Sequence, residues 1–172
     1  MRVRNKSVKL YHGSPHGFAK IIPTIGSPKN DFGLGWYGAT RKKYAEDRGE
    51  LQAKKINAPM YYLYQYEFDD DEANDDGISY RRFVDDEAWA EFVLENAIGE
   101  NPENPYDITS GPYCDMAARK KSVEAYRRMK SRGEVDFGTM IEIMEPNMDD
   151  IQYTFHTPRA TKYLKYPKRY IR

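Results

Sequence analysis

The stretch from residue 60 to residue 68, Met60-Tyr-Tyr-Leu-Tyr-Gln-Tyr-Glu-Phe68, guides the interpretation of the whole chain. Its residues alternate with a period of two, and most of them are aromatic. Successive side chains of a β-strand point to opposite faces of a sheet, and aromatic residues are enriched in strands. The stretch is therefore the strongest strand signal in the sequence.

The sequence before this strand predicts a strand at residues 3–11 and a second strand at residues 35–40. A long loop is expected at residues 15–35 and a helix at residues 41–53. The loop is rich in glycine and proline and shows little apolar periodicity. Long loops in compact domains are often functional. Thr40 is well placed to cap the helix that follows it.

The sequence after the central strand predicts strands at residues 78–83, 106–109 and 151–155, helices at residues 85–98, 115–132 and 138–145, and a final helix that begins at Thr157-Pro158. The acidic residues 67–76 are expected to form a turn or loop, because like charges repel when they are packed together. Strands grouped at both ends with helices between them are typical of an α+β fold with a largely antiparallel sheet. The length fits one domain over residues 1–172.

Composition narrows the function classes only slightly. Lysine plus arginine and aspartate plus glutamate number 27 each, so the net charge indicates no particular partner. Cys114 is the one cysteine, so no disulfide can form within the chain. The sequence shows no apolar signal segment and no run of the roughly 20 apolar residues that a membrane span needs. We therefore expect a cytoplasmic protein without a membrane partner.

Several common catalytic motifs are absent from the sequence. Gly33-Leu-Gly35 lacks the third glycine of the dinucleotide-binding fingerprint, and no phosphate-binding loop ending in Gly-Lys-Ser/Thr is present. The three histidines do not have zinc-ligand spacing with one another or with the cysteine, so no metal is expected. A hydrolase that uses His12 and Ser14 stays open, although Ser14 lies in no nucleophile-elbow pattern.

Three short segments combine residue types that suit a ligand site. Tyr11-His-Gly-Ser14 places an imidazole beside accessible backbone, because glycine lets a ligand approach the main chain. Asn30-Asp-Phe-Gly-Leu-Gly-Trp-Tyr37 repeats this feature and adds Tyr37, whose ring can stack on a flat heterocycle. Asp150-Ile-Gln-Tyr-Thr-Phe155 is a late strand that places the amide of Gln152 on one face.

These segments, in this order, resemble ADP-ribosyltransferases of the histidine–tyrosine–glutamate class, which contains diphtheria toxin and the poly-ADP-ribose polymerases. The resemblance is greatest to small bacterial and phage domains of that superfamily, which are often found near toxin–antitoxin genes. The motifs that carry it span nearly the whole chain and are Tyr11–Ser14, Asp31–Tyr37, Tyr106–Pro112 and Gln152–Thr157. The resemblance implies a split antiparallel β-sheet core with peripheral helices.

The resemblance also implies roles for individual residues. His12 would contact the adenosine-side ribose of NAD, and the backbone of Gly13 would hold the nicotinamide amide. Tyr37 would stack on the nicotinamide ring, and Gln152 stands where the class has its catalytic glutamate. The implied catalytic residues are His12, Tyr37 and Gln152, and the implied NAD-binding residues are Tyr11, His12, Gly13, Ser14, Asp31, Phe32, Gly33, Gly35, Tyr37 and Tyr44. NAD is thereby implied as a substrate, with no metal.

Two positions depart from the pattern of the class. Gln152 is neutral, so it can orient a ribose but cannot act as a base or carry a full negative charge. Glu142 and Glu145 are the nearby upstream carboxylates that could take the catalytic role instead. Arg48 stands where the class often has a second aromatic residue, which leaves Tyr44 as the aromatic candidate. The neutral glutamine keeps open an alternative function, a non-catalytic module that binds NAD or ADP-ribose.

The sequence therefore predicts mono-ADP-ribosyl transfer from NAD to a macromolecule, in a toxin or a phage-defence effector. Residues 119–132 carry seven bases and one acid, and residues 162–172 interleave bases with tyrosines. Such surfaces bind phosphates and stack on bases, which favours a nucleic-acid acceptor such as RNA over a protein. An antitoxin protein would be a further partner, with the acidic residues 67–76 or the basic tail as its docking site.

Overall fold

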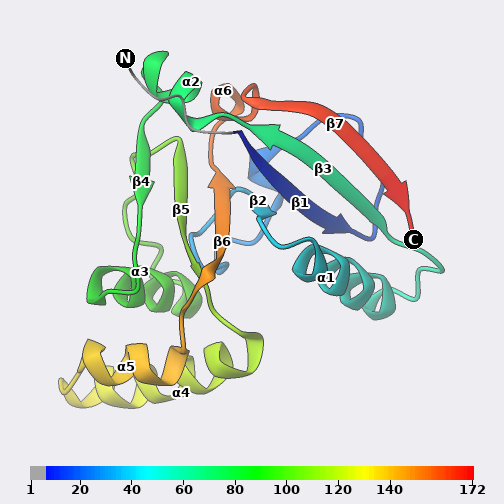
Figure 1. Ribbon diagram of the computed structural model, residues 1–172. Helices are drawn as coiled ribbons and strands as arrows, with labels where there is room; N and C mark the ends of the chain where they lie inside the picture. The colour runs from blue at the N-terminus through cyan, green and yellow to red at the C-terminus, as the bar shows by residue number, and fades with distance from the viewer. Residues whose placement is uncertain (1–6) are drawn as a thin grey trace.

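Seven strands form one mixed sheet in the order β4-β5-β6-β2-β1-β3-β7, in a computed structural model that describes residues 7–172 (Figure 1). Neighbouring strands are antiparallel except β4 and β5, which are parallel. The predicted α+β class, with a largely antiparallel sheet and peripheral helices, is confirmed. The strands are β1 (Val8–Ser14), β2 (Trp36–Ala39), β3 (Tyr62–Phe68), β4 (Tyr80–Arg82), β5 (Ile108–Tyr113), β6 (Asn147–Phe155) and β7 (Leu164–Ile171).

Within residues 7–172 the helices are α1 (Lys42–Lys55), α2 (Asp70–Asp75), α3 (Glu87–Ile98), α4 (Met116–Arg132), α5 (Phe137–Met144), α6 (Pro158–Thr161) and the short 3₁₀ helix η1 (Pro23–Ile25). Asp86, Asp115 and Asp136 precede α3, α4 and α5, and each side chain accepts a hydrogen bond from a backbone N–H of the first turn. Gly99 and Gly133 end α3 and α4 in the left-handed conformation that glycine favours. No helix in this part of the chain is both long enough and apolar enough to pass through a membrane.

The acidic residues 67–76 are not the loop that the sequence predicts, because α2 lies within them. The side chain of Asp69 accepts a hydrogen bond from the N–H of Glu72, and acidic residues in a first turn suit the positive end of a helix. Lys165 of β7 forms an ion pair with Glu72. Capping and pairing with a distant base offset the repulsion among these carboxylates.

The prediction of a final helix after Thr157-Pro158 is wrong for most of the tail. The helix α6 ends at Thr161, and the tail then forms β7, which pairs with β3 along the edge of the sheet. The tail carries Pro167 and several bases, so its local sequence gives little strand signal. Pairing with β3, about 100 residues earlier in the chain, makes it a strand.

Two boundaries at the start of the chain also differ from expectation. The first strand was expected to begin at Val3, but residues 1–6 lie outside the described residues, and β1 continues through Ser14. Thr40 does not cap α1, which begins after Arg41. Its hydroxyl instead donates to the backbone C=O of Ile151 and accepts from the backbone N–H of Ile151, which joins the end of β2 to β6.

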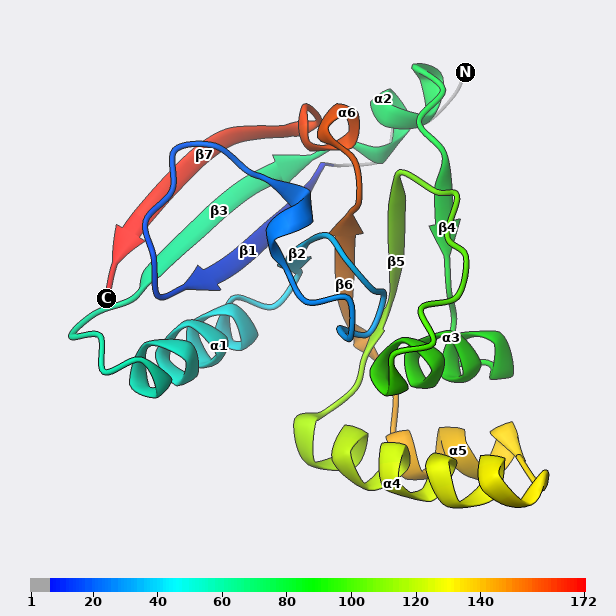
Figure 2. The same ribbon diagram turned by 180° about the vertical axis from the view of Figure 1, so that it is seen from behind.

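The sheet consists of two halves that meet at one residue pair. Strands β1 and β2 pair through Tyr11 and Ala39, whereas β1 and β3 pair through seven residues. Strand β2 pairs with β6 at four positions and so belongs to the other half. Figures 1 and 2 show α1 beside the half formed by β1, β3 and β7, and α3, α4 and α5 beside the other half. The split sheet that the resemblance implies is present.

Each face of the sheet carries its own apolar cluster. Helices α3, α4 and α5 build the first, in which Trp89 and Met140 are fully buried. The second includes several aromatic side chains from the strands, among them Trp36 and Phe155. Tyr37 packs on the first cluster although its neighbour Trp36 belongs to the second, because consecutive strand residues point to opposite faces. The two clusters thereby fix the directions of the Trp36 and Tyr37 side chains on β2.

Helix α1 lies directly on β1 because two glycines make room for it. A Cβ atom at Gly13 would stand 1.8 Å from the backbone oxygen of Ala45 and 2.7 Å from the backbone nitrogen of Gly49. A Cβ atom at Gly49 would in turn stand 3.2 Å from the Cα of Gly13. The space on this side of Gly13, which the sequence assigns to a ligand, is filled by helix backbone.

We expect Gly13→Ala to lower the free energy of unfolding by about 1–3 kcal/mol or more, because backbone atoms cannot move aside as a flexible side chain can. Urea unfolding followed by circular dichroism measures the change. Gly138→Ala is the control, since its Cβ would contact only the Asp136 side chain, at 3.3 Å, inside helix α5. An unchanged unfolding midpoint for Gly13→Ala would contradict the close packing of α1 on β1.

Candidate functional site

The three motif-bearing strands are direct neighbours in the sheet. Tyr11 of β1 pairs with Ala39 of β2, and Ala39 pairs with Gln152 of β6. These three residues form one row across the strands, and paired residues share a face of the sheet. Tyr37 lies two residues before Ala39 and so shares the face of Gln152. The structure therefore brings two of the three predicted catalytic residues, Tyr37 and Gln152, to one face.

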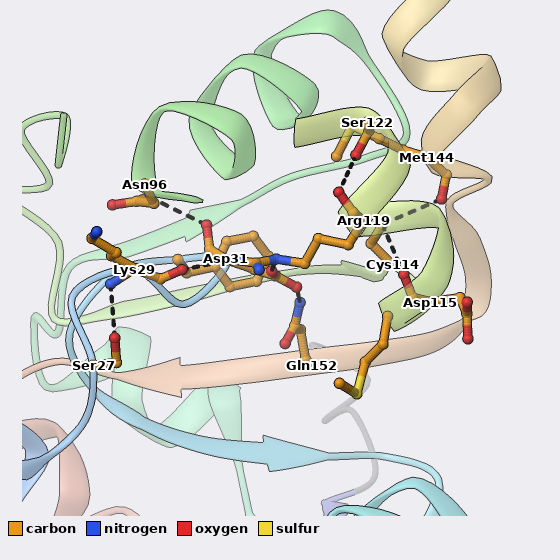
Figure 3. Close-up of polar contacts among 12 residues, drawn as sticks. Ser27, Lys29, Asp31, Asn96, Cys114, Asp115, Arg119, Ser122, Met144 and Gln152 are labelled. Atoms are coloured by element: carbon orange, nitrogen blue, oxygen red, sulfur yellow. Dashed lines mark hydrogen bonds and ion pairs between the residues drawn. The ribbon is translucent and has the colours of Figure 1, made fainter. Parts of the chain in front are cut away.

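A buried carboxylate contacts Gln152 (Figure 3). The side-chain nitrogen of Gln152 donates to Oδ2 of Asp31 at 2.8 Å. The other carboxylate oxygen accepts from Nε of Arg119, at 2.6 Å, in an ion pair. Arg119 lies in the first turns of α4, and Asp31 lies in the loop before β2. A loop, a strand and a helix thus meet at one hydrogen-bonded group.

Besides Arg119, two further side chains hold the loop that carries Asp31. The hydroxyl of Tyr37 accepts from the N–H of Phe32 at 3.0 Å and donates to the C=O of Gly33 at 2.6 Å. Asn96 of α3 donates to the backbone C=O of Asp31 at 3.2 Å. Burial raises the pKa of the Tyr37 phenol far above its ordinary value, so the group stays neutral. The hydroxyl of Tyr37 therefore anchors the loop.

His12 lies at the join between the two halves of the sheet. Its Nδ1 is 2.7 Å from the backbone oxygen of Tyr37, and its ring stacks on Trp36 at 5.0 Å between centroids. A carbonyl oxygen can only accept, so Nδ1 carries the proton and Nε2 of the neutral ring keeps a lone pair. Burial lowers the pKa of His12, and the positive charge of Arg48 lowers it further. His12 thus packs on the cluster opposite to Gln152, while its ring bridges β1 and β2.

Two tyrosines from different elements pack against each other, and the charge of Asp31 acts on one of them, Tyr113. Tyr44 of α1 packs against Tyr113 of β5 with ring centroids 4.1 Å apart, and Arg41 lies 5.4 Å above the Tyr44 ring. Arg41 also forms an ion pair with the buried Asp150 at 3.0 Å. Burial raises the pKa of Tyr113 to about 12. The flat rings and the guanidinium of Arg41 suit a ligand that has a heterocycle and phosphates.

Sequence reasoning missed Tyr113 and Arg119. Tyr113 directly follows the Gly111-Pro112 pair of a recognised motif, so its position gave a signal that could have found it. Arg119 is one of seven bases in residues 119–132, and nothing in the local sequence marks it. Its function depends on contact with a loop about 90 residues earlier.

The motif glycines at positions 33 and 35 make room for other parts of the chain. Gly33 has a φ of +79°, and a Cβ there would stand 3.0 Å from the Asn96 side chain. A Cβ at Gly35 would stand 2.4 Å from Cγ2 of Thr154 on β6. Phe32, between Asp31 and Gly33, is buried in the first apolar cluster. The predicted glycine contacts of this motif serve the packing of the loop on β6 and α3.

The remaining candidates lie at other positions. Tyr11 is half-buried on β1 in the row with Gln152. The hydroxyl of Ser14 accepts from the N–H of His16, and Nδ1 of His12 is occupied by Tyr37, so this nitrogen is not the base that a Ser14 hydrolase needs. Glu142 and Glu145 are exposed on α5 and at its end. The carboxylate that contacts Gln152 is the one of Asp31.

Comparison with known proteins identifies a family. The family model described as "Protein of unknown function (DUF3990)" matches residues 8–166. No curated protein and no solved structure matches the chain. The match covers every motif strand and every residue of the site described above.

We expect acidification to weaken the fold through His12. A histidine whose pKa is lowered in the folded state binds its proton more readily in the unfolded chain, so the free energy of unfolding falls as the pH drops below about 6.5. Histidine signals followed by NMR should show His12 titrating below that value. His12→Asn should reduce the pH dependence of unfolding, and His156→Asn should reduce it separately, because burial lowers that pKa too. Titration of His12 above 6.5 would contradict the burial described here.

Proposed function

Because the chain belongs to the DUF3990 family, for which no function is described, we propose its activity from the site: it transfers ADP-ribose from NAD to a macromolecular acceptor. The observation that carries the proposal is the adjacency of β1, β2 and β6, which bear His12, Tyr37 and Gln152. These residues follow one another along the chain in the same order as in the enzymes that the sequence resembles. In the sheet, their three strands are neighbours. The site lies beside the join of the split sheet, where β1 and β2 stop pairing.

The proposed chemistry requires few groups from the protein. The bond between the nicotinamide nitrogen and C1′ of the ribose breaks, and nicotinamide leaves with the bonding electron pair. A nucleophile of the acceptor forms the new bond to C1′ and releases its proton to solvent. The side-chain oxygen of Gln152 accepts a hydrogen bond from a hydroxyl of this ribose and faces the positive charge that develops on it. Nε2 of His12 keeps a lone pair, and its ring lies at the join on the face opposite to Gln152, so in this proposal NAD spans the join and places a hydroxyl of its other ribose at His12.

The exposed bases of α4 support a nucleic-acid acceptor such as RNA over a protein acceptor. The helix starts at the site, because Arg119 contacts Asp31, and its exposed bases are Lys120, Lys121, Arg127, Arg128 and Arg132. A row of bases that begins beside the site can hold the phosphates of a polymer while one of its groups reacts. The bases of β7 lie along the edge of the other half of the sheet, away from α4 (Figure 1).

A toxin or phage-defence role, with an antitoxin as partner, rests on the resemblance alone. The two charged segments offered as docking sites for such a partner contact each other. Lys165 of the tail pairs with Glu72, and the hydroxyl of Tyr163 donates to Asp76 at 2.7 Å. A partner that binds either segment would have to accommodate both.

We expect the protein to release nicotinamide from NAD and to label one polymer class when it is incubated with labelled NAD and total cell protein, RNA or DNA. Gln152→Ala should reduce the rate on the order of 10²-fold, the cost of removing one transition-state contact, whereas His12→Ala should raise KM for NAD, because His12 contacts the ribose that does not react. Gln65→Ala is the matched control. This glutamine lies on β3, the neighbour of β1 on the side away from β2, and pairs with Tyr11, so it lies outside the group of strands that bear the site. Melting temperatures of all variants separate loss of activity from loss of fold.

Binding of NAD without release of nicotinamide by the unchanged protein would contradict transfer. It would favour the alternative, a recognition module for NAD or ADP-ribose, for which the neutral Gln152 is suited.

If α4 binds the acceptor, Lys120→Glu combined with Lys121→Glu should reduce the labelling of RNA on the order of 10-fold, because each lost phosphate contact weakens binding. Release of nicotinamide in the absence of RNA should not change, since both lysines are exposed and outside the site. Lys168→Glu combined with Arg169→Glu on β7 is the control pair. Equal losses for both pairs would show that general charge, not the α4 surface, attracts the polymer.

A further inference from the structure

The neutral Gln152 has a negative charge beside it. Asp31 is buried, with 9% of its surface exposed, and its Oδ2 accepts the hydrogen bond of the Gln152 amide at 2.8 Å. Gln152 itself is buried with 7% exposed. A hydrogen bond between an amide and a buried carboxylate is charge-assisted and stronger than one between neutral groups. Sequence reasoning placed Asp31 among the NAD ligands, whereas both of its oxygens are occupied by protein groups.

This contact decides which end of the Gln152 amide is presented to a ligand. A carboxylate can only accept hydrogen bonds, so the NH₂ group must face Asp31 and the oxygen must point away from it. The negative charge also polarises the amide and increases the partial negative charge on its oxygen. The pair therefore presents an oriented, electron-rich acceptor, although the residue that bears it carries no charge.

We propose that Asp31 is a positioning residue for the transfer reaction, in which its carboxylate orients Gln152 and supplies the negative charge that a glutamate would otherwise carry. This inference rests on the proposed function and assigns the charge to a residue in the loop before β2. Gln152 touches the ribose, and Asp31 acts through it. The two side chains together do the work of one catalytic carboxylate.

The surroundings of Asp31 hold it in this position. Arg119 donates to its Oδ1 through Nε at 2.6 Å and also donates through Nη2 to the backbone oxygen of Lys29 at 2.5 Å. Asn96 binds its backbone oxygen, and Tyr37 binds the next two residues of the loop. Figure 3 shows Asp31 between Arg119 and Gln152, with the glutamine rising from β6. Contacts from α3, α4 and β2 thus fix the carboxylate before a ligand arrives, as a preorganised site requires.

A reciprocal exchange of the two groups tests the proposal. Asp31→Asn should lower kcat on the order of 10-fold and leave KM for NAD nearly unchanged, because the charge acts on the developing transition state. Gln152→Glu should lower both kcat and the melting temperature, since two carboxylates would then face each other. Asp31→Asn combined with Gln152→Glu should restore both, because the introduced amide could accept from Arg119 and donate to the introduced carboxylate. Asp149→Asn, an exposed acid on the same strand, is the control.

The outcomes separate the two proposals. Recovery of melting temperature without recovery of kcat in the double variant would reduce Asp31 to a structural partner and overturn the inference. A higher kcat for Asp31→Asn would also overturn it, because Asp31 would then be a group that blocks the site. Turnover by the unchanged protein with an unaffected Asp31→Asn rejects the inference alone. No NAD turnover by the unchanged protein rejects the proposed function, and the catalytic role of Asp31 with it.

Discussion

The join between β1 and β2 is the constraint on which the rest of the structure depends. One residue pair, Tyr11 with Ala39, links the two halves of the sheet, and the second apolar cluster spans both of them. The imidazole of His12 adds a second link by binding the backbone oxygen of Tyr37, an acceptor that a continued ladder would have used. A side chain thus takes the place of strand pairing, and the backbone around it is free to diverge.

The site next to this join is built from side-chain contacts more than from regular structure. The loop before β2 has one short 3₁₀ turn, so its shape depends on Tyr37, Asn96 and Arg119, which bind its backbone and its one buried acid. Asn96 and Arg119 come from α3 and α4, and Tyr37 of β2 points to the face of the sheet on which these helices pack. The apolar core and the polar site are therefore coupled, because moving either helix would move the carboxylate beside Gln152.

Local sequence predicted the elements whose signals are local. The alternation of the central strand and the helices α3 and α4 follow from neighbouring residues, and all three elements are present. The helix α2 and the strand β7 were missed, because an ion pair with a distant lysine and pairing with β3 stabilise them. The order of motifs anticipated that the strands of His12, Tyr37 and Gln152 would come together. The contact of Asp31 with Arg119 could not be predicted, since the local sequence of neither segment indicates that the two lie close together in the fold.

The two edges of the sheet determine how the protein behaves at high concentration. Strand β4 at one edge has three residues, which is too short to template a partner. Strand β7 at the other edge contains Pro167, a Tyr166 with a φ of +51° and exposed Lys168 and Arg169, and its pairing with β3 is irregular at this point. Proline, an irregular backbone and repelling charges are the features by which natural edge strands avoid joining one another. These edge features therefore oppose ordered aggregation, although many of the strands are rich in aromatic residues.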